Sequence, residues 1–121
     1  MSRIATVAGL VLLIAMLLPA ADVTGTWKGS FEFNGQDVPL TFVMKTAQGV
    51  VTGTVDGLPT PNAEIKEGKI DGDDLTFSIN IDYQGNPVRL VVKGKVAGDQ
   101  IKFDLGTDDG AWSTQLTAKK S

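Results

Sequence analysis

The chain has 121 residues with 11 basic and 14 acidic side chains, and it contains neither cysteine nor histidine. The acidic balance argues against nucleic acid and anionic membrane surfaces as partners, because both require a basic face. Without cysteine there is no disulfide, and without histidine the commonest general base and transition-metal ligand is missing, so we expect a domain that needs no cofactor.

Residues 1–21 have the layout of a secretory signal peptide. Arg3 precedes a long apolar run that ends in Pro-Ala-Ala. These small residues predict cleavage after Ala20 or Ala21, which leaves 22–121 as a single domain of a secreted or periplasmic protein with no membrane span in its mature form. A retained N-terminal anchor is the alternative, and it is disfavoured because no basic stop-transfer cluster follows the apolar run.

Beyond the signal segment, apolar and polar side chains alternate with the period of half-buried strands. Short turns separate the alternating segments, and Asn34-Gly35 is the strongest of these signals because both residues tolerate positive φ. The expected strands span residues 23–33, 37–47, 50–57, 63–70, 75–83, 88–96, 100–106 and 111–120.

One stretch of the chain occurs twice. Residues 68–79 read GKIDGDDLTFSI and residues 94–105 read GKVAGDQIKFDL. We interpret the repeat as one hairpin used twice in a barrel, since its Gly, Asp and Phe residues have turn or core roles; a duplicated binding motif is the alternative. Ile65 and Ile70 are both expected to point inward although they are five apart, which predicts a β-bulge at Glu67-Gly68 in the first copy and none in the second.

The strand pattern predicts an all-β fold. Eight antiparallel strands in meander order either close into an up-and-down β-barrel or stack as a β-sandwich. We favour the eight-stranded barrel, because nothing in the outer strands looks like the protection that an exposed sheet edge requires.

Two resemblances follow from short motifs. Gly25-Thr26-Trp27 on the first strand, together with Lys119 and Lys120 on the last, resembles the calycin barrels, which include lipocalins and avidins. The resemblance implies that Trp27 closes one end of the barrel beneath Lys119 or Lys120, of which we take Lys119 as the partner. The segments TGTWKGSFEF and VVTGTVDG and the two GK units also resemble a family of small secreted bacterial domains of unknown function, which implies the compartment and the barrel but no activity.

The sequence contains few residues in arrangements suited to catalysis or to metal binding. Two clusters of aspartates, which we interpret as solvated turn residues because neither has the spacing of a calcium loop, are Asp71, Asp73 and Asp74, and Asp104, Asp108 and Asp109. No acid falls at an inward position, as a glycosidase pair would require. The hydroxyls of Ser30, Ser78 and Ser113 are expected on outer faces without an activating base. We therefore predict no metal site and no enzyme, with an uncharacterised hydrolase as a remaining alternative.

The inner face carries the aromatic candidates for ligand contact, which are Trp27, Phe42, Phe77, Phe103 and Trp112. An eight-stranded barrel is either filled by side chains or holds one small ligand. A packed interior is favoured, although inward glycines could leave room. The sequence thus predicts a secreted, non-enzymatic barrel, and a cavity in its interior, if one is present, would suit a small apolar ligand. The alternative is a structural or interaction protein of the cell envelope, which would contact an envelope protein through its outer wall and mouth loops.

Overall fold

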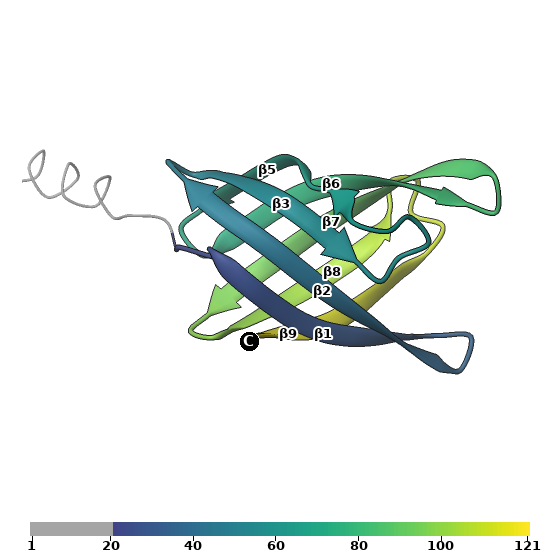
Figure 1. The fold of residues 1–121 in the computed structure, drawn as a ribbon, viewed down its shortest axis with the longest axis horizontal. Coiled ribbons are helices and arrows are strands. Elements are labelled where there is room, and N and C mark those ends of the chain that lie inside the picture. The colour runs from purple at the N-terminus through teal and green to yellow at the C-terminus, as the bar shows by residue number, and fades with distance from the viewer. Residues whose placement is uncertain (1–20) are drawn as a thin grey trace, which may run out of the picture.

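The computed structural model describes residues 21–121, which form nine β-strands joined by turns and loops (Figure 1). The predicted signal peptide lies, apart from Ala21, outside the described residues. The strands are β1 (Gly25–Phe33), β2 (Gln36–Ala47), β3 (Val50–Asp56), β4 (Ala63–Glu64), β5 (Lys66–Asp71), β6 (Asp74–Tyr83), β7 (Asn86–Ala97), β8 (Gln100–Thr107) and β9 (Ser113–Lys120). Residues 21–121 contain no helix of the length and apolarity that a membrane span requires.

The strands close into an antiparallel barrel. Neighbours in sequence pair from β1 to β3 and from β5 to β9, β3 pairs with both β4 and β5, and β9 pairs back with β1. This arrangement confirms the predicted eight-stranded up-and-down barrel and excludes the sandwich. The strand expected over 63–70 is divided at Ile65 into the two-residue β4 and the longer β5, both of which pair with β3.

The tight turns consist of residues that tolerate the positive φ that the turn geometry requires. Asn34-Gly35, Gln48-Gly49 and Gln84-Gly85 all have positive φ at both residues, from 53° to 83°. This conformation matches the right-handed twist of the flanking strands. Asn86, which was expected in the turn with Gln84-Gly85, instead begins β7.

The two copies of the repeat differ in shape. The pairing of β5 with β6 shifts register between Lys66 and Lys69, and Glu67 has a φ of 55°. Around Gly94 the register of β7 is continuous with both of its neighbours. The predicted bulge at Glu67-Gly68 is therefore confirmed, and so is its absence from the second copy.

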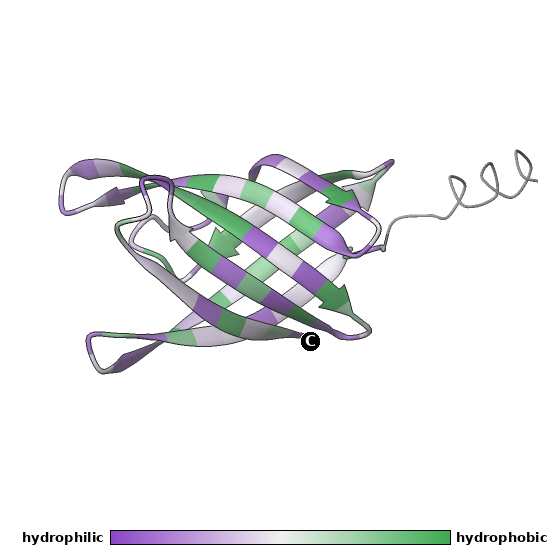
Figure 2. Cartoon of the chain, turned by 180° about the vertical axis from the view of Figure 1, so that it is seen from behind, coloured by the Kyte–Doolittle hydropathy of each residue, from purple (hydrophilic) through white to green (hydrophobic). Residues whose placement is uncertain are grey.

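Inward side chains fill most of the barrel. Figure 2 shows the alternation of hydrophobic and hydrophilic positions along the strands. Phe42 and Phe103 stack with ring centroids 4.6 Å apart, and Phe77 meets Phe103 edge-on at 6.3 Å. Tyr83 keeps its predicted inward orientation but is 39% exposed, because it lies at the tip of the β6–β7 hairpin beyond the packed core. The interior is a packed core along most of its length.

We expect the two repeated glycines to tolerate alanine differently. A Cβ at Gly68 would lie 2.1 Å from the backbone oxygen of Val51, whereas one at Gly94 would meet side-chain atoms of Ile101 and Phe103 at 2.9 Å. Side chains can shift, so Gly94→Ala should cost about 1–3 kcal/mol. Gly68→Ala should cost more, because a carbonyl of the neighbouring strand can move only if β3 and β5 separate. Urea unfolding measures both, and an equal or smaller loss at Gly68 would contradict this account.

Candidate functional site: the open mouth of the barrel

One end of the barrel is closed by the start of the described chain. The backbone N–H of Ala21 donates to the carbonyl of Gly72 at 2.9 Å, and the side chain of Val23 is fully buried. The indole Nε1 of Trp27 donates to the carbonyl of Val23 at 2.9 Å. Trp27 is 1% exposed, so its ring and the N-terminal segment together seal this end.

Lys120, and not Lys119, is the basic side chain over Trp27. The Nζ of Lys120 lies 5.8 Å from the centroid of the Trp27 ring, and the two residues are paired between β1 and β9. Lys119 pairs with Lys28 and is exposed. The choice of Lys119 as barrel-closing partner was wrong, because side chains alternate along β9 and the buried Ala118 puts Lys120 on the inner side.

Alanine substitutions of Lys119 and Lys120 should show whether Lys120 stabilises the closed end of the barrel through its contact with Trp27. A cation over an indole face contributes about 0.5–1 kcal/mol where it is accessible to water. We therefore expect Lys120→Ala to lower the free energy of unfolding by about that amount and Lys119→Ala to leave it within the range of ordinary surface substitutions, about 0.5 kcal/mol. Urea unfolding of both variants provides the measurement. Equal losses would show that Lys120 does not act through Trp27.

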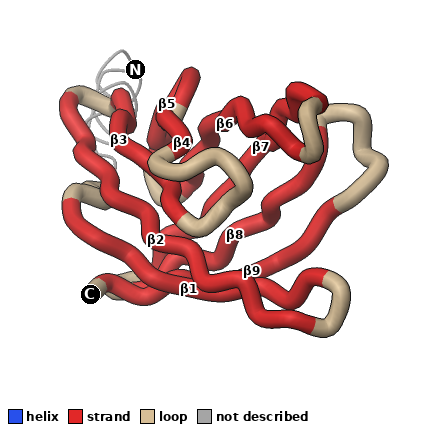
Figure 3. Tube along the Cα trace, turned by 45° about the vertical axis from the view of Figure 1, so that its right-hand side comes forward, coloured by secondary structure: helices blue, strands red, loops and turns tan. Residues whose placement is uncertain are grey.

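The opposite end of the barrel is open and contains a pocket of about 540 Å³. Four connections surround it: the β1–β2 and β6–β7 hairpins, the loop after β3 and the loop between β8 and β9, which are turned toward the viewer in Figure 3. The lining is almost entirely apolar and includes Phe31, Phe33, Ile81, Tyr83, Val88 and Trp112. This is a concave site with an aromatic wall.

Trp112 is held in the pocket wall by the loop that carries it. Its backbone N–H donates to Thr107 Oγ1 at 3.1 Å, and the backbone N–H of Thr107 donates to the Trp112 carbonyl at 2.9 Å. Its ring centroid lies 5.6 Å from that of Phe31 and 5.8 Å from that of Phe33. The Asp109 carboxylate accepts from the N–H of Ala111, and this bond lowers the pKa of Asp109. The loop therefore presents Trp112 in a fixed position.

Only one of the sequence-predicted ligand contacts lines this pocket. Trp112 does so, whereas Trp27, Phe42, Phe77 and Phe103 are 1–3% exposed and belong to the packed core. The lining residues that were not predicted as ligand contacts include Phe33, Ile81, Tyr83 and Val88. They are the inward positions closest to the turns at the mouth. Their location at the ends of the strands is the sequence signal that could have identified them.

The bulge carries a polar network on the outer wall. The side chain of Arg89 lies 2.8 Å from Glu67 Oε1 and 4.0 Å from Asp108 Oδ2. Ser78 lies on the outer face as predicted, but it is only 3% exposed, and its hydroxyl donates to Glu67 Oε1 at 3.0 Å. Hydrogen bonds from Arg89 and then from Ser78 lower the pKa of Glu67. A carboxylate held ionised beside an arginine is a poor base, so the network fastens the bulge and does not activate the serine.

The lowered pKa of Glu67 predicts how the stability of the fold changes at acidic pH. A carboxyl whose pKa is lower in the folded chain than in the unfolded chain stabilises the fold above its ordinary value, here 4.5. That stabilisation is lost as the pH falls through the folded pKa. We therefore expect Glu67→Gln to be less stable than the wild type at about pH 7, and the difference to shrink at about pH 3.

Urea unfolding at the two pH values tests this prediction. Glu32→Gln is the matched control, because Glu32 forms no ion pair with any other residue of 21–121. It should show no loss of stability at neutral pH. A difference between Glu67→Gln and wild type that stays constant with pH would refute a role for the ionised carboxylate.

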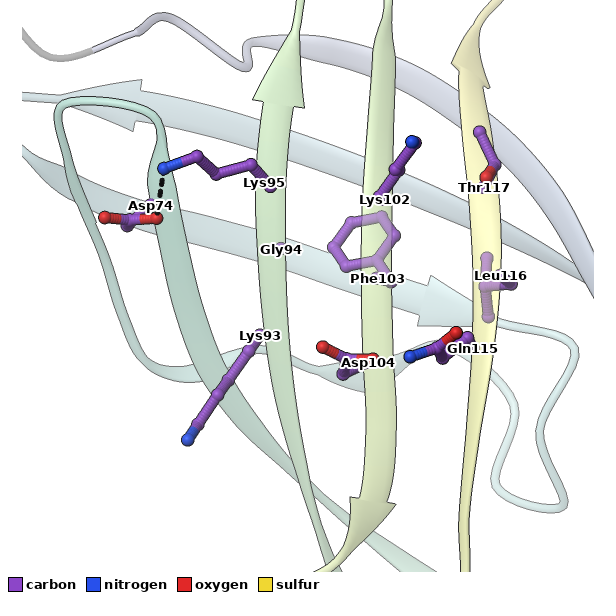
Figure 4. A pocket seen from close by; sticks show the side chains of 10 residues that line it. All are labelled: Asp74, Lys93, Gly94, Lys95, Lys102, Phe103, Asp104, Gln115, Leu116 and Thr117. Carbon is purple, nitrogen blue, oxygen red and sulfur yellow. Dashed lines mark hydrogen bonds and ion pairs between the residues drawn. The ribbon is translucent and has the colours of Figure 1, made fainter.

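A second depression lies on the outer wall across β7, β8 and β9. It has a volume of about 600 Å³, and its side chains include Lys93, Lys95, Lys102, Asp104 and Gln115 (Figure 4). The ion pair between Lys95 Nζ and Asp74 Oδ1, at 3.0 Å, flanks it and raises the pKa of Lys95. Although this depression is slightly larger than the mouth pocket, it is lined by exposed charged side chains of both signs and has only a few apolar residues. The mouth is the better candidate site.

The turn aspartates do not form a metal site in the part of the chain that the structure describes. Within residues 21–121 no three acidic side chains come together in a way that could hold an ion. Asp71, Asp73, Asp74, Asp108 and Asp109 are all exposed. Their positions in or beside the turns agree with the interpretation as solvated turn residues, whereas Asp104, which was interpreted in the same way, is exposed within β8 and does not lie in a turn.

Comparison with known proteins returns no relative: no protein-family model, no curated protein and no solved structure matches the chain. The two resemblances noted in the sequence stay predictions.

Proposed function

We propose that the protein is a secreted, non-enzymatic β-barrel that binds one small apolar ligand in the pocket at its open mouth. The observation that carries the proposal is the pocket itself, about 540 Å³ with a nearly continuous apolar and aromatic lining. Sites for small molecules in proteins are concave, mostly apolar and of about 300–1,000 Å³. Export is inferred from the signal-like sequence of residues 1–21.

The packed core limits where the ligand can bind. Phe42 and Phe77 both pack against Phe103 below the mouth and leave the ligand only the upper part of the barrel. The site is thus a cup on top of a solid core, in place of the interior cavity considered from the sequence. A cup open on one side suits a ligand with an apolar part that enters and another part that stays in water.

The lining supports binding better than catalysis. Thr107 is the polar lining residue at the base of the β8–β9 loop, and its hydroxyl is engaged with the backbone of Trp112. Tyr83 adds one phenol at the rim. The lining contains no carboxylate or lysine that could serve as a base.

A bulky residue in the cup should abolish binding without unfolding the barrel. Val88 is half-buried in the pocket lining, so Val88→Trp would occupy the volume available to a ligand. We expect the affinity for the uncharged fluorescent probe N-phenylnaphthylamine to fall at least about tenfold, measured by titration of the full chain.

Val43→Trp is the matched control, because Val43 is 48% exposed on the outer wall. It adds the same side chain outside the cup and should bind the probe like the wild type. If Val88→Trp and Val43→Trp bind alike, the probe does not enter the mouth and the proposed function fails.

A further inference from the structure

Acidic residues surround the mouth. The five acids that are each adjacent in the chain to a residue lining the pocket are Glu32, Asp37, Asp56, Asp82 and Asp108. They alternate with inward lining positions, so their carboxylates stand on the outer side of the rim and remain exposed to water. The pocket thus has an apolar wall inside and a negative ring outside.

Few bases balance this ring. Arg89 is the one basic residue adjacent to lining positions, and its guanidinium is shared between Glu67 and Asp108. The strand register places most lysines in the other half of the barrel, namely Lys45, Lys69, Lys95, Lys102, Lys119 and Lys120. The charges of the barrel are therefore unevenly divided between its two ends.

The β1–β2 hairpin keeps an unfavourable pair within the ring. Glu32 lies directly opposite Asp37 in the register of the two strands, and both side chains are exposed. Like charges that face each other across strands are destabilising. Within residues 21–121 neither carboxylate forms an ion pair. The fold itself gains nothing from this arrangement, which points to a use for the negative potential.

We propose that the ligand of the mouth pocket is a small organic cation with an apolar tail, of the alkylammonium type. This inference rests on the proposed function and specifies its ligand class. The tail would pack in the cup, and the cationic head would remain at the rim, where the carboxylates attract it. The faces of Phe31, Tyr83 and Trp112 would add cation–π attraction to a head close to the aromatic wall.

The charge complementarity also disfavours a common alternative, a fatty acid. A fatty acid would fit the cup equally well with its tail but would bring a carboxylate to a rim of carboxylates. The rim charges act at a distance, so their effect should be strong in dilute salt and weak above about 1 M, where the Debye length is about 3 Å.

The test compares three ligands with one tail. Decyltrimethylammonium, decanol and decanoate, each below its micelle concentration, are titrated into the full chain by calorimetry in dilute and in concentrated salt. We expect the cation to bind about tenfold more tightly than the anion in dilute salt, with decanol between them, and the difference to shrink in concentrated salt.

Two triple variants locate the source of the preference. Glu32→Gln, Asp37→Asn and Asp82→Asn together remove three charges at the mouth. Asp71→Asn, Asp73→Asn and Asp99→Asn remove three from the turns at the closed end, with the same change in net charge. The mouth triple should weaken binding of the cation about fivefold and strengthen binding of decanoate, whereas the closed-end triple should change neither by more than about twofold.

The outcomes separate this inference from the function on which it rests. Equal affinities for the three ligands, a preference for decanoate, or equal effects of the two triples would overturn the cationic ligand, while binding that Val88→Trp abolishes would leave the apolar cup in place. If none of the three decyl ligands binds, or if Val88→Trp has no effect on those that do, the proposed function fails as well.

Discussion

The structure depends on the closure of the first strand onto the last. β9 pairs with β1 through two residue pairs, Trp27 with Lys120 and Lys28 with Lys119, both near the closed end. Toward the mouth β9 still lies close to β1, since the backbone oxygen of Thr117 would clash with a Cβ on Gly29. The two strands nevertheless form no further residue pairs there. The join is tight at the closed end and loosens toward the mouth, which is where the pocket lies.

The alternation of apolar and polar residues predicted most of this fold. A strand with one apolar face can bury that face in only one register, because a shift by one residue would turn its apolar side chains to the solvent. The alternation predicted the bulge from the spacing of Ile65 and Ile70 alone. It could also have selected Lys120 over Lys119, since Leu116 and Ala118 define the inner side of β9. Tyr83 follows the same alternation but lies beyond the core, and alternation does not encode where the core ends.

The site was less predictable than the fold for a related reason. Whether an inward aromatic residue is core or pocket depends on its height along the barrel axis, which the stagger between strands determines. Phe103 and Trp112 both alternate inward, yet Phe103 is packed against the rings of Phe42 and Phe77, whereas Trp112 lies at the rim. The bulged copy of the repeat proved to be a fastening of β5 to β6 and β7, with no reactive group, while the pocket formed at strand ends that the repeat does not include.

Both ends of the described chain lie at the same pole of the barrel. Ala21 binds Gly72 at the closed end, and the N–H of Ser121 donates to Thr26 on the first strand, also near that end (Figure 1). Anything attached before Ala21 or after Ser121 therefore joins the domain on the side opposite the mouth. A tether or fusion at either end would leave the cup facing away from its attachment point and accessible from the surrounding solution.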